Sequence, residues 1–160
     1  MEGAIEIKDK ELHRVTATCV IYKGEEFLIT RRSLEKKFLP GKWHVPGGGV
    51  TTDDYTNLPK GGQDQWYHPL SSAIRREVRE EVNLEIGEPE YFNDLAFIKP
   101  DGLAVLNVCF FAPYASGEVA LDADTMDYKW VRLEELGNFD LIKGLEGEIK
   151  LVSDILQKRA

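Results

Sequence analysis

The sequence predicts an α/β (α+β) fold in which two helices cover the faces of a mixed β-sheet, an α/β/α sandwich. Runs rich in β-branched and aromatic residues recur along the chain, and two longer segments carry apolar residues at helical spacing. Short turns containing Gly or Pro separate many of these segments. Strands mixed with two principal helices fit this architecture because each helix buries its apolar stripe against the sheet.

The N-terminal half contributes two strands and one helix. Residues 15–22 are rich in β-branched side chains, and residues 27–30 form a second strand after the turn at residues 23–26. A glycine-rich stretch follows, and Pro69 then opens a helix at its first turn. The helix is anchored by an apolar stripe at four-residue spacing, formed by Leu70, Ile74, Val78 and Val82.

The C-terminal half contributes a hairpin, a strand and a helix. Residues 90–99 and 103–112 flank Pro-Asp-Gly at residues 100–102, in which Pro presets one backbone dihedral and Gly frees another. This pattern predicts a β-hairpin. Residues 128–133 form a late strand, and residues 144–158 close the chain as an amphipathic helix.

Length and charge limit the class of protein. The chain has 160 residues, 42% of them hydrophobic and 30% charged, which predicts a single domain over residues 1–160 with a substantial core. The formal net charge of −8 disfavours a nucleic-acid partner, which selects for a basic face. An acidic protein still binds phosphates when a metal ion stands between the two.

The cellular compartment follows from cysteines and apolar runs. Cys19 and Cys109 each lie inside an apolar run and are interpreted as buried free thiols of a reducing compartment. Residues 1–4 lack the basic region of a secretory leader, and no apolar run approaches the roughly 18 residues of a membrane helix. The sequence therefore predicts a cytoplasmic protein without a membrane partner.

The most informative feature is the acidic run at residues 76–81. On a helix, Glu77, Glu80 and Glu81 lie three and four positions apart and share one side. Clustered carboxylates repel one another unless a cation lies among them, and a hard divalent ion such as Mg²⁺ suits them best. The alternative is a solvated helix face whose charge is balanced by three arginines, Arg75, Arg76 and Arg79.

A second feature lies upstream, where residues 43–50 end an apolar stretch with Gly47, Gly48 and Gly49. Glycines let main-chain groups approach a ligand closely, so that a glycine carbonyl can join a metal shell. The alternative for this stretch alone is an ordinary turn after a strand.

Together the two features resemble the Nudix box, G-x5-E-x7-R-E-U-x-E-E-x-G-U, in which U is a bulky aliphatic residue. Gly48 matches the opening glycine, residues 76–77 the Arg-Glu pair and residues 80–81 the acidic pair. The remaining matches are Ala73, Val78 and Leu84. Outside the box, the arginines that end residues 27–32 and the strand and short helix of residues 130–136 are also similar to the family.

The chain departs from the family pattern between the glycines and the helix. Residues 51–69 contain an insertion, and the box glutamate is missing. Its place is taken either by Asp54, which keeps the plain spacing from Gly48, or by His68, which lies just before the helix. The closing glycine is replaced by Asn83, which tolerates the left-handed conformation of helix ends.

The resemblance implies a hydrolase that cleaves the diphosphate of a nucleoside diphosphate linked to another moiety, using Mg²⁺ or Mn²⁺. It implies that Glu77, Glu80, Glu81 and the carbonyl of Gly48 hold the metal, that Glu77 and Glu81 are catalytic, and that Arg76 braces the carboxylates. The partner is then a small nucleotide-type molecule. Two alternatives are a catalytically weak nucleotide-binding module and an isomerase of isoprenoid diphosphates.

Further site residues are expected outside the box. The family often recruits one distal acid, and the candidates are Asp122, Asp124 and Asp127, of which Asp124 is preferred, then Asp127. A surface acidic loop explains these three residues equally well. Arg31 or Arg32 is expected to bind phosphate, since neighbouring strand residues face opposite ways.

The insertion at residues 51–69 adds Trp66 and Tyr67 as candidate substrate contacts. It is either a substrate lid or a surface elaboration that packs on the domain or on the second subunit of a homodimer.

Overall fold

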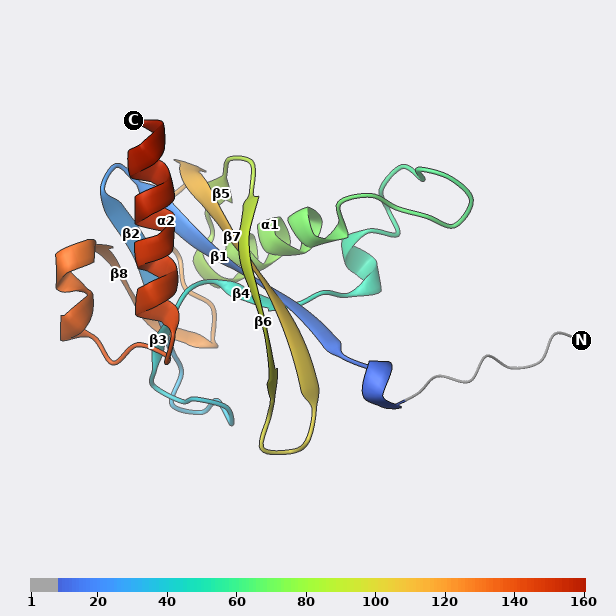
Figure 1. Ribbon diagram of the computed structural model, residues 1–160, viewed down its shortest axis with the longest axis horizontal. Coiled ribbons are helices and arrows are strands. Elements are labelled where there is room, and N and C mark those ends of the chain that lie inside the picture. Colours follow the sequence, from blue (N-terminus) through green and yellow to red (C-terminus); the bar gives the residue numbers. More distant parts are fainter. Residues whose placement is uncertain (1–8) are drawn as a thin grey trace, which may run out of the picture.

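The computed structural model describes residues 9–160 and has the predicted α/β/α architecture (Figure 1). Helix α1 (Pro69–Val82) covers one face of a mixed sheet, and helix α2 (Leu145–Arg159) covers the other. The expectation that residues 1–4 are not a secretory leader concerns residues outside the described range. No helix within residues 9–160 is both long and apolar enough to span a membrane.

Eight strands form the sheet, and three short 3₁₀ helices lie between them or at their ends. The strands are β1 (Arg14–Lys23), β2 (Glu26–Arg32), β3 (Trp43–His44), β4 (Gly47–Gly49), β5 (Glu85–Ile86), β6 (Glu90–Ile98), β7 (Ala104–Ser116) and β8 (Thr125–Arg132). The 3₁₀ helices are η1 (Asp9–Glu11), η2 (Thr52–Asp54) and η3 (Leu133–Asn138).

The sheet is mixed because β1 pairs with β7 in parallel, while its pairings with β2 and β4 are antiparallel. Strand β8 extends the sheet antiparallel to β2, and β6 runs antiparallel to β7. The predicted β6–β7 hairpin is present, and β1 and β2, predicted as successive strands joined by a turn, also pair as a hairpin. Gly24 and Gly102 have positive φ in the two turns. The central β1 therefore carries the glycine strand β4 directly against one of its edges.

Helix α1 forms where the pattern predicted it. Pro69 occupies the first turn, and Ile74, Val78 and Val82 are fully buried on the sheet. Burial of such a side chain is worth about 1.5 to 3 kcal/mol, so the stripe fixes the rotation of the helix about its axis. Asn83 ends the helix in the left-handed conformation, and its N–H donates to the carbonyl of Arg79 at 3.0 Å. The acidic side of the last two turns is thereby turned toward β4.

Two hydrophobic cores lie on the two faces of the sheet. One lies between α1 and the sheet and includes Ile21, Leu28 and Val78; the other lies beneath α2 and includes Ile29, Phe111 and Ile149. Alternate residues of β1 and β2 point into alternate cores, which is the period-2 pattern of a sheet covered on both sides. Any polar side chain of β2 or β8 on the α1 face is thus directed toward the acidic helix.

Candidate active site

The glycine strand brings the backbone close to the acidic helix. Gly47, Gly48 and Gly49 pair with Thr18, Ala17 and Thr16 of β1. A Cβ atom at Gly47 would overlap the carbonyl of Ala17, and one at Gly48 would overlap the carboxylate of Glu77. Glycine is therefore required at Gly47, where the overlap is with the backbone of β1, whereas a side chain at Gly48 would displace the Glu77 carboxylate.

Arg76 is the hub of the site. Its guanidinium donates to the Gly49 carbonyl at 2.9 Å, to the Glu77 carboxylate at 2.8 Å and to the Glu80 carboxylate at 3.1 Å. It also forms a bidentate ion pair with the fully buried carboxylate of Asp54. This arrangement ties the helix, the glycine strand and the start of the insertion together, which is the bracing geometry expected of Arg76.

Asp54 and His68, the two candidates for the missing box glutamate, lie in different surroundings. Asp54 contacts Arg76, and its Oδ2 also accepts from the N–H of Thr51 at 2.8 Å. Burial raises the pKa of Asp54, but the hydrogen bonds from Arg76 and Thr51 outweigh it and hold the pKa below its ordinary value. His68 instead precedes the first turn of α1 in a left-handed conformation. Asp54 thus occupies the position beside the arginine.

Glu77 and Glu81 form a crowded, largely buried carboxyl pair. The side chain of Glu77 is 14% exposed. Burial, then the charge of Glu77 and then that of Asp122 raise the pKa of Glu81 to about 9, and the backbone amide of Gly47 acts in the opposite direction. Burial also raises the pKa of Glu77, against the influence of Arg76. A carboxyl group in the position of Glu81, whose pKa is raised by burial and by neighbouring charges, is a candidate functional group.

The distal acids separate into distinct environments. The Asp122 backbone N–H donates to the Glu81 carbonyl at 3.3 Å, and the charge of Asp122 acts on the Glu81 carboxyl. Asp124 is exposed and pairs with Lys36 at 3.2 Å. Asp127 accepts a hydrogen bond from the N–H of Tyr128. The preference for Asp124 stays a prediction, and the geometry favours Asp122 as the acid that joins the glutamates.

The two arginines of β2 face different surroundings, as their alternation predicted. Arg31 donates to the Gly41 carbonyl at 3.0 Å. Arg32 donates to the Phe38 carbonyl at 3.0 Å; burial lowers its pKa, while Glu81 and Asp124 act to raise it. Arg32 is therefore the arginine whose charge reaches the acidic site.

His44 was not among the predicted site residues, yet it borders the same region. Its Nδ1 atom is buried and has no hydrogen-bond partner among residues 9–160, and burial together with the charge of Arg32 lowers its pKa to about 4. At neutral pH the His44 imidazole is therefore uncharged, and Arg32 is the positively charged group of this pair. The sequence carried no signal for it, since a single histidine in an apolar strand is usually structural.

Trp66 and Tyr67 are not brought to the glutamates. They line a separate cavity of about 560 Å³ at the start of α1, together with Val50 and Tyr55. The rings of Tyr55 and Trp66 are 5.5 Å apart, and Tyr67 is 64% exposed. Glu81 lies twelve residues beyond Pro69 in sequence, which corresponds to roughly 18 Å along a helix at about 1.5 Å per residue. Figure 1 shows the inserted loop extending away from the sheet at this end of α1.

The acidic residues have the chemistry to bind a hard divalent cation, but their side chains are not arranged around a common point. Within residues 9–160, no three acidic, histidine or cysteine side chains converge closely enough to hold a metal ion. Glu80 is turned to Arg76, and the Glu77 and Glu81 carboxyls crowd together as like charges. Carboxylate and carbonyl oxygens are the ligands of Mg²⁺ and Mn²⁺, and a cation relieves the repulsion that raises the pKa of Glu81. The residues present therefore fit such an ion.

Comparison with known proteins identifies the class. The family model for the NUDIX domain matches residues 12–154, so the chain belongs to the Nudix family. It is 27% identical to the nucleoside triphosphatase NudI of Klebsiella pneumoniae strain 342 over 79% of this chain and 87% of that protein. It is 30% identical to the isopentenyl-diphosphate Delta-isomerase of the same strain over 80% of this chain and 65% of that protein.

Among solved structures, the NUDIX domain of Shewanella oneidensis NrtR in complex with ADP ribose superimposes with a TM-score of 0.70. The sequence identity is 17%, and the match covers 94% of each chain, so this similarity concerns the fold. The expectation of a Nudix-type pyrophosphohydrolase is confirmed at the level of the enzyme class by the family match and the hydrolase relatives.

Proposed function

We propose that the protein hydrolyses the diphosphate linkage of a nucleoside diphosphate joined to another moiety, with Mg²⁺ or Mn²⁺ as cofactor. The observation that carries this proposal is the buried pair of Glu77 and Glu81 against Gly47 and Gly48. We also propose that the protein is a single domain with an inserted loop at residues 51–69 and that it is cytoplasmic. The two buried cysteines, which form no disulfide, support a reducing compartment.

Each residue has a role that follows from its contacts. Glu77, Glu80, Glu81 and the Gly48 carbonyl would hold the cation, and Arg76 with Asp54 keeps the glutamates on the side of α1 that faces β4. A bound cation supplies charge neutralisation at the phosphates and at the leaving oxygen. Arg32 would bind a phosphate oxygen through its guanidinium.

The reaction requires an attacking water molecule to lose a proton as its oxygen bonds to phosphorus and the bridging P–O bond breaks. Asp122 is the carboxylate available to accept that proton, since it lies beside Glu81 without an ion pair among residues 9–160. Asp124, by contrast, has Lys36 as its partner.

The test is a screen of nucleoside triphosphates, nucleotide sugars, ADP-ribose and dinucleotides with Mg²⁺ or Mn²⁺. We expect Glu81→Gln to lose at least about a hundredfold in kcat because a source of transition-state charge stabilisation is lost. The control is Glu146→Gln, an exposed glutamate of α2 that pairs with Lys150. Activity of Glu81→Gln close to that of Glu146→Gln would refute the site.

Isomerisation of an isoprenoid diphosphate is the second candidate, and the 30% identity to an isopentenyl-diphosphate isomerase is the observation that favours it. The two reactions differ in what remains of the substrate. Hydrolysis separates the two phosphate groups, whereas isomerisation leaves the diphosphate intact. Phosphorus NMR of the products distinguishes them, and an unchanged diphosphate with a shifted double bond would replace the hydrolase proposal.

A further inference from the structure

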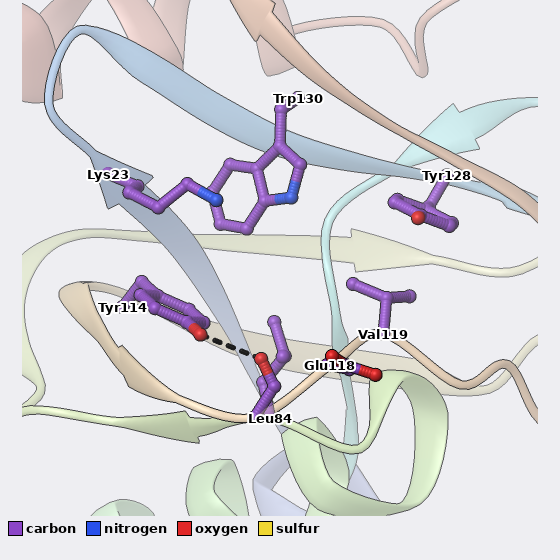
Figure 2. Close-up of a pocket in the computed structure, with 8 residues that line it drawn as sticks. Lys23, Leu84, Tyr114, Glu118, Val119, Tyr128 and Trp130 are labelled. Carbon is purple, nitrogen blue, oxygen red and sulfur yellow. Dashed lines mark hydrogen bonds between the residues drawn. The ribbon is translucent and has the colours of Figure 1, made fainter.

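A cleft of about 430 Å³ lies on the same face of the sheet as α1, beyond the residues assigned above. Figure 2 shows Trp130 and Tyr128 of β8 on one side of it, and Tyr114, Glu118 and Val119 on the other, with Lys23 at the indole. Its volume is within the range of small-molecule sites, about 300 to 1,000 Å³.

Two opposite charges in this cleft have no ionic partner. Lys23 Nζ lies 4.3 Å from the centroid of the Trp130 ring and 5.0 Å from that of Tyr114, and it forms no ion pair with any residue of the described chain. Cation–π contacts of this kind hold an ammonium in place without neutralising it. Glu118 likewise has no ion pair within residues 9–160. The cleft therefore offers one fixed donor and one acceptor.

The walls of the cleft are held in place. Tyr114 donates its hydroxyl hydrogen to the Gly117 carbonyl at 2.7 Å, and its ring meets that of Trp130 edge to face at 6.0 Å. The Glu118 carbonyl accepts from Asn83 Nδ2 at 3.2 Å, and the Ala120 N–H donates to the Val82 carbonyl at 3.1 Å. Because these walls are already ordered in the free protein, binding of a ligand would cost little conformational entropy.

We propose that this cleft binds a glycosyl ring, a polyhydroxylated six-membered or five-membered sugar. A hydroxyl group donates to a carboxylate and accepts from an ammonium, so hydroxyls on opposite edges of one ring would bind Glu118 and Lys23 on the two sides of the cleft. Tyr128 offers an aromatic surface against the C–H face of the ring, while Lys23 lies over the face of Trp130. A bare phosphate would be repelled by Glu118, and Lys23 covers the Trp130 face that a stacked nucleobase would need.

The cleft adjoins the acidic site through one loop. Val119 lines the cleft, and three residues later Asp122 lies against Glu81. A diphosphate placed at Glu81 would thus direct its attached group along this loop toward the cleft. Binding of a sugar ring in the cleft does not depend on the proposed hydrolysis. Its role as the second moiety of the substrate does rest on that proposal, and it makes nucleotide sugars the favoured substrates.

The test is binding of α-D-glucose 1-phosphate to the full chain without metal, followed through the indole N–H resonance of Trp130, assigned with Trp130→Phe. Inorganic phosphate and AMP are the comparison probes. We expect glucose 1-phosphate to shift this resonance, and both Lys23→Met and Glu118→Gln to weaken its binding about tenfold. Lys129→Met, a change at the neighbouring exposed lysine of β8, should bind as the unaltered protein does.

Three results would overturn the proposal: an equal shift with inorganic phosphate, a stronger shift with AMP, or no shift with any probe. Kinetics add an independent readout, since KM for a nucleotide sugar should rise about tenfold in Lys23→Met and in Glu118→Gln. If Glu81→Gln retained activity, the hydrolytic site would be wrong while the binding result would stand. The two proposals therefore fail separately.

Discussion

Among single residues, the site contains two kinds of carboxylate: those that pair with Arg76 and those that lie close to other carboxylates. Arg76 pairs with Asp54 and also contacts Glu77 and Glu80. The carboxyls of Glu77, Glu81 and Asp122, by contrast, bring like charges together. The pair fixes geometry, and the crowded carboxyls create affinity for a cation. Changes at the two kinds of residue should therefore have different effects on stability.

Asp54→Ala should lower the free energy of unfolding by about 1 to 3 kcal/mol, because Arg76 loses its buried partner but stays partly exposed to water. The measurement is urea unfolding at pH 7. Asp64→Ala, an exposed residue of the same insertion that pairs with Lys60, is the control. Equal stability of the two variants would show that the Asp54 pair does not brace the site.

His44 gives the protein a pH dependence on the acid side. Its pKa falls from 6.5 to about 4 on folding, so the folded state binds fewer protons in that window. Stability from His44 is complete above pH 6.5 and is lost as pH falls through about 4, by on the order of 3 kcal/mol.

Urea unfolding between pH 4 and 7 checks this dependence. His44→Gln should show a smaller loss of stability on acidification, whereas His13→Gln, at an exposed position, should keep the original slope. A slope in His44→Gln that matches that of the unaltered protein would contradict the assignment.

At the scale of elements, the sequence predicted the long ones well. The four-residue stripe placed α1, and Pro-Asp-Gly placed the β6–β7 hairpin. Helix α2 starts one residue later than predicted because Gly144 is its N-cap. Strands β3, β4 and β5 have two or three residues, too few for a periodic pattern, and they were not predicted.

The candidate site was predictable where it lies within one element and not where elements meet. The grouping of Glu77, Glu80 and Glu81 follows from local spacing on α1, whereas Gly48 was assigned through the resemblance to the Nudix box. The contact between Arg76 and Asp54 depends on how the insertion folds against α1. The position of Asp122 beside Glu81 depends on the path of the loop after Ser116. Lys23 and Trp130 meet only through the pairing of strands distant in sequence.

The inserted loop should have little influence on turnover, because Trp66 and Tyr67 lie at the end of α1 away from Glu81. Removing residues 57–65, which retains Asp54, is expected to change KM by less than about twofold on a nucleotide panel. Tyr67→Ala should behave alike. A tenfold or larger rise in KM in either variant would support the lid hypothesis instead.

At the scale of the whole molecule, the two faces of the sheet have different tasks. The α2 face carries a core built on Phe111 and Ile149, and the α1 face carries the acidic site and the neighbouring cleft. The net charge of −8 repels an anionic substrate at long range, so a bound cation must reverse the local field before a diphosphate can enter. We therefore expect the glutamates beside the glycine strand to bind a divalent cation.

Titration of the metal-free protein with Mn²⁺ by calorimetry, in two buffers of different ionisation enthalpy, tests this claim most directly. We expect binding that strengthens with rising pH and releases protons, since the Glu81 carboxyl must ionise to hold the ion. Glu81→Gln should bind at least about tenfold more weakly, and Glu146→Gln should bind normally. Equal Mn²⁺ affinity in Glu81→Gln and the unaltered protein would contradict the account.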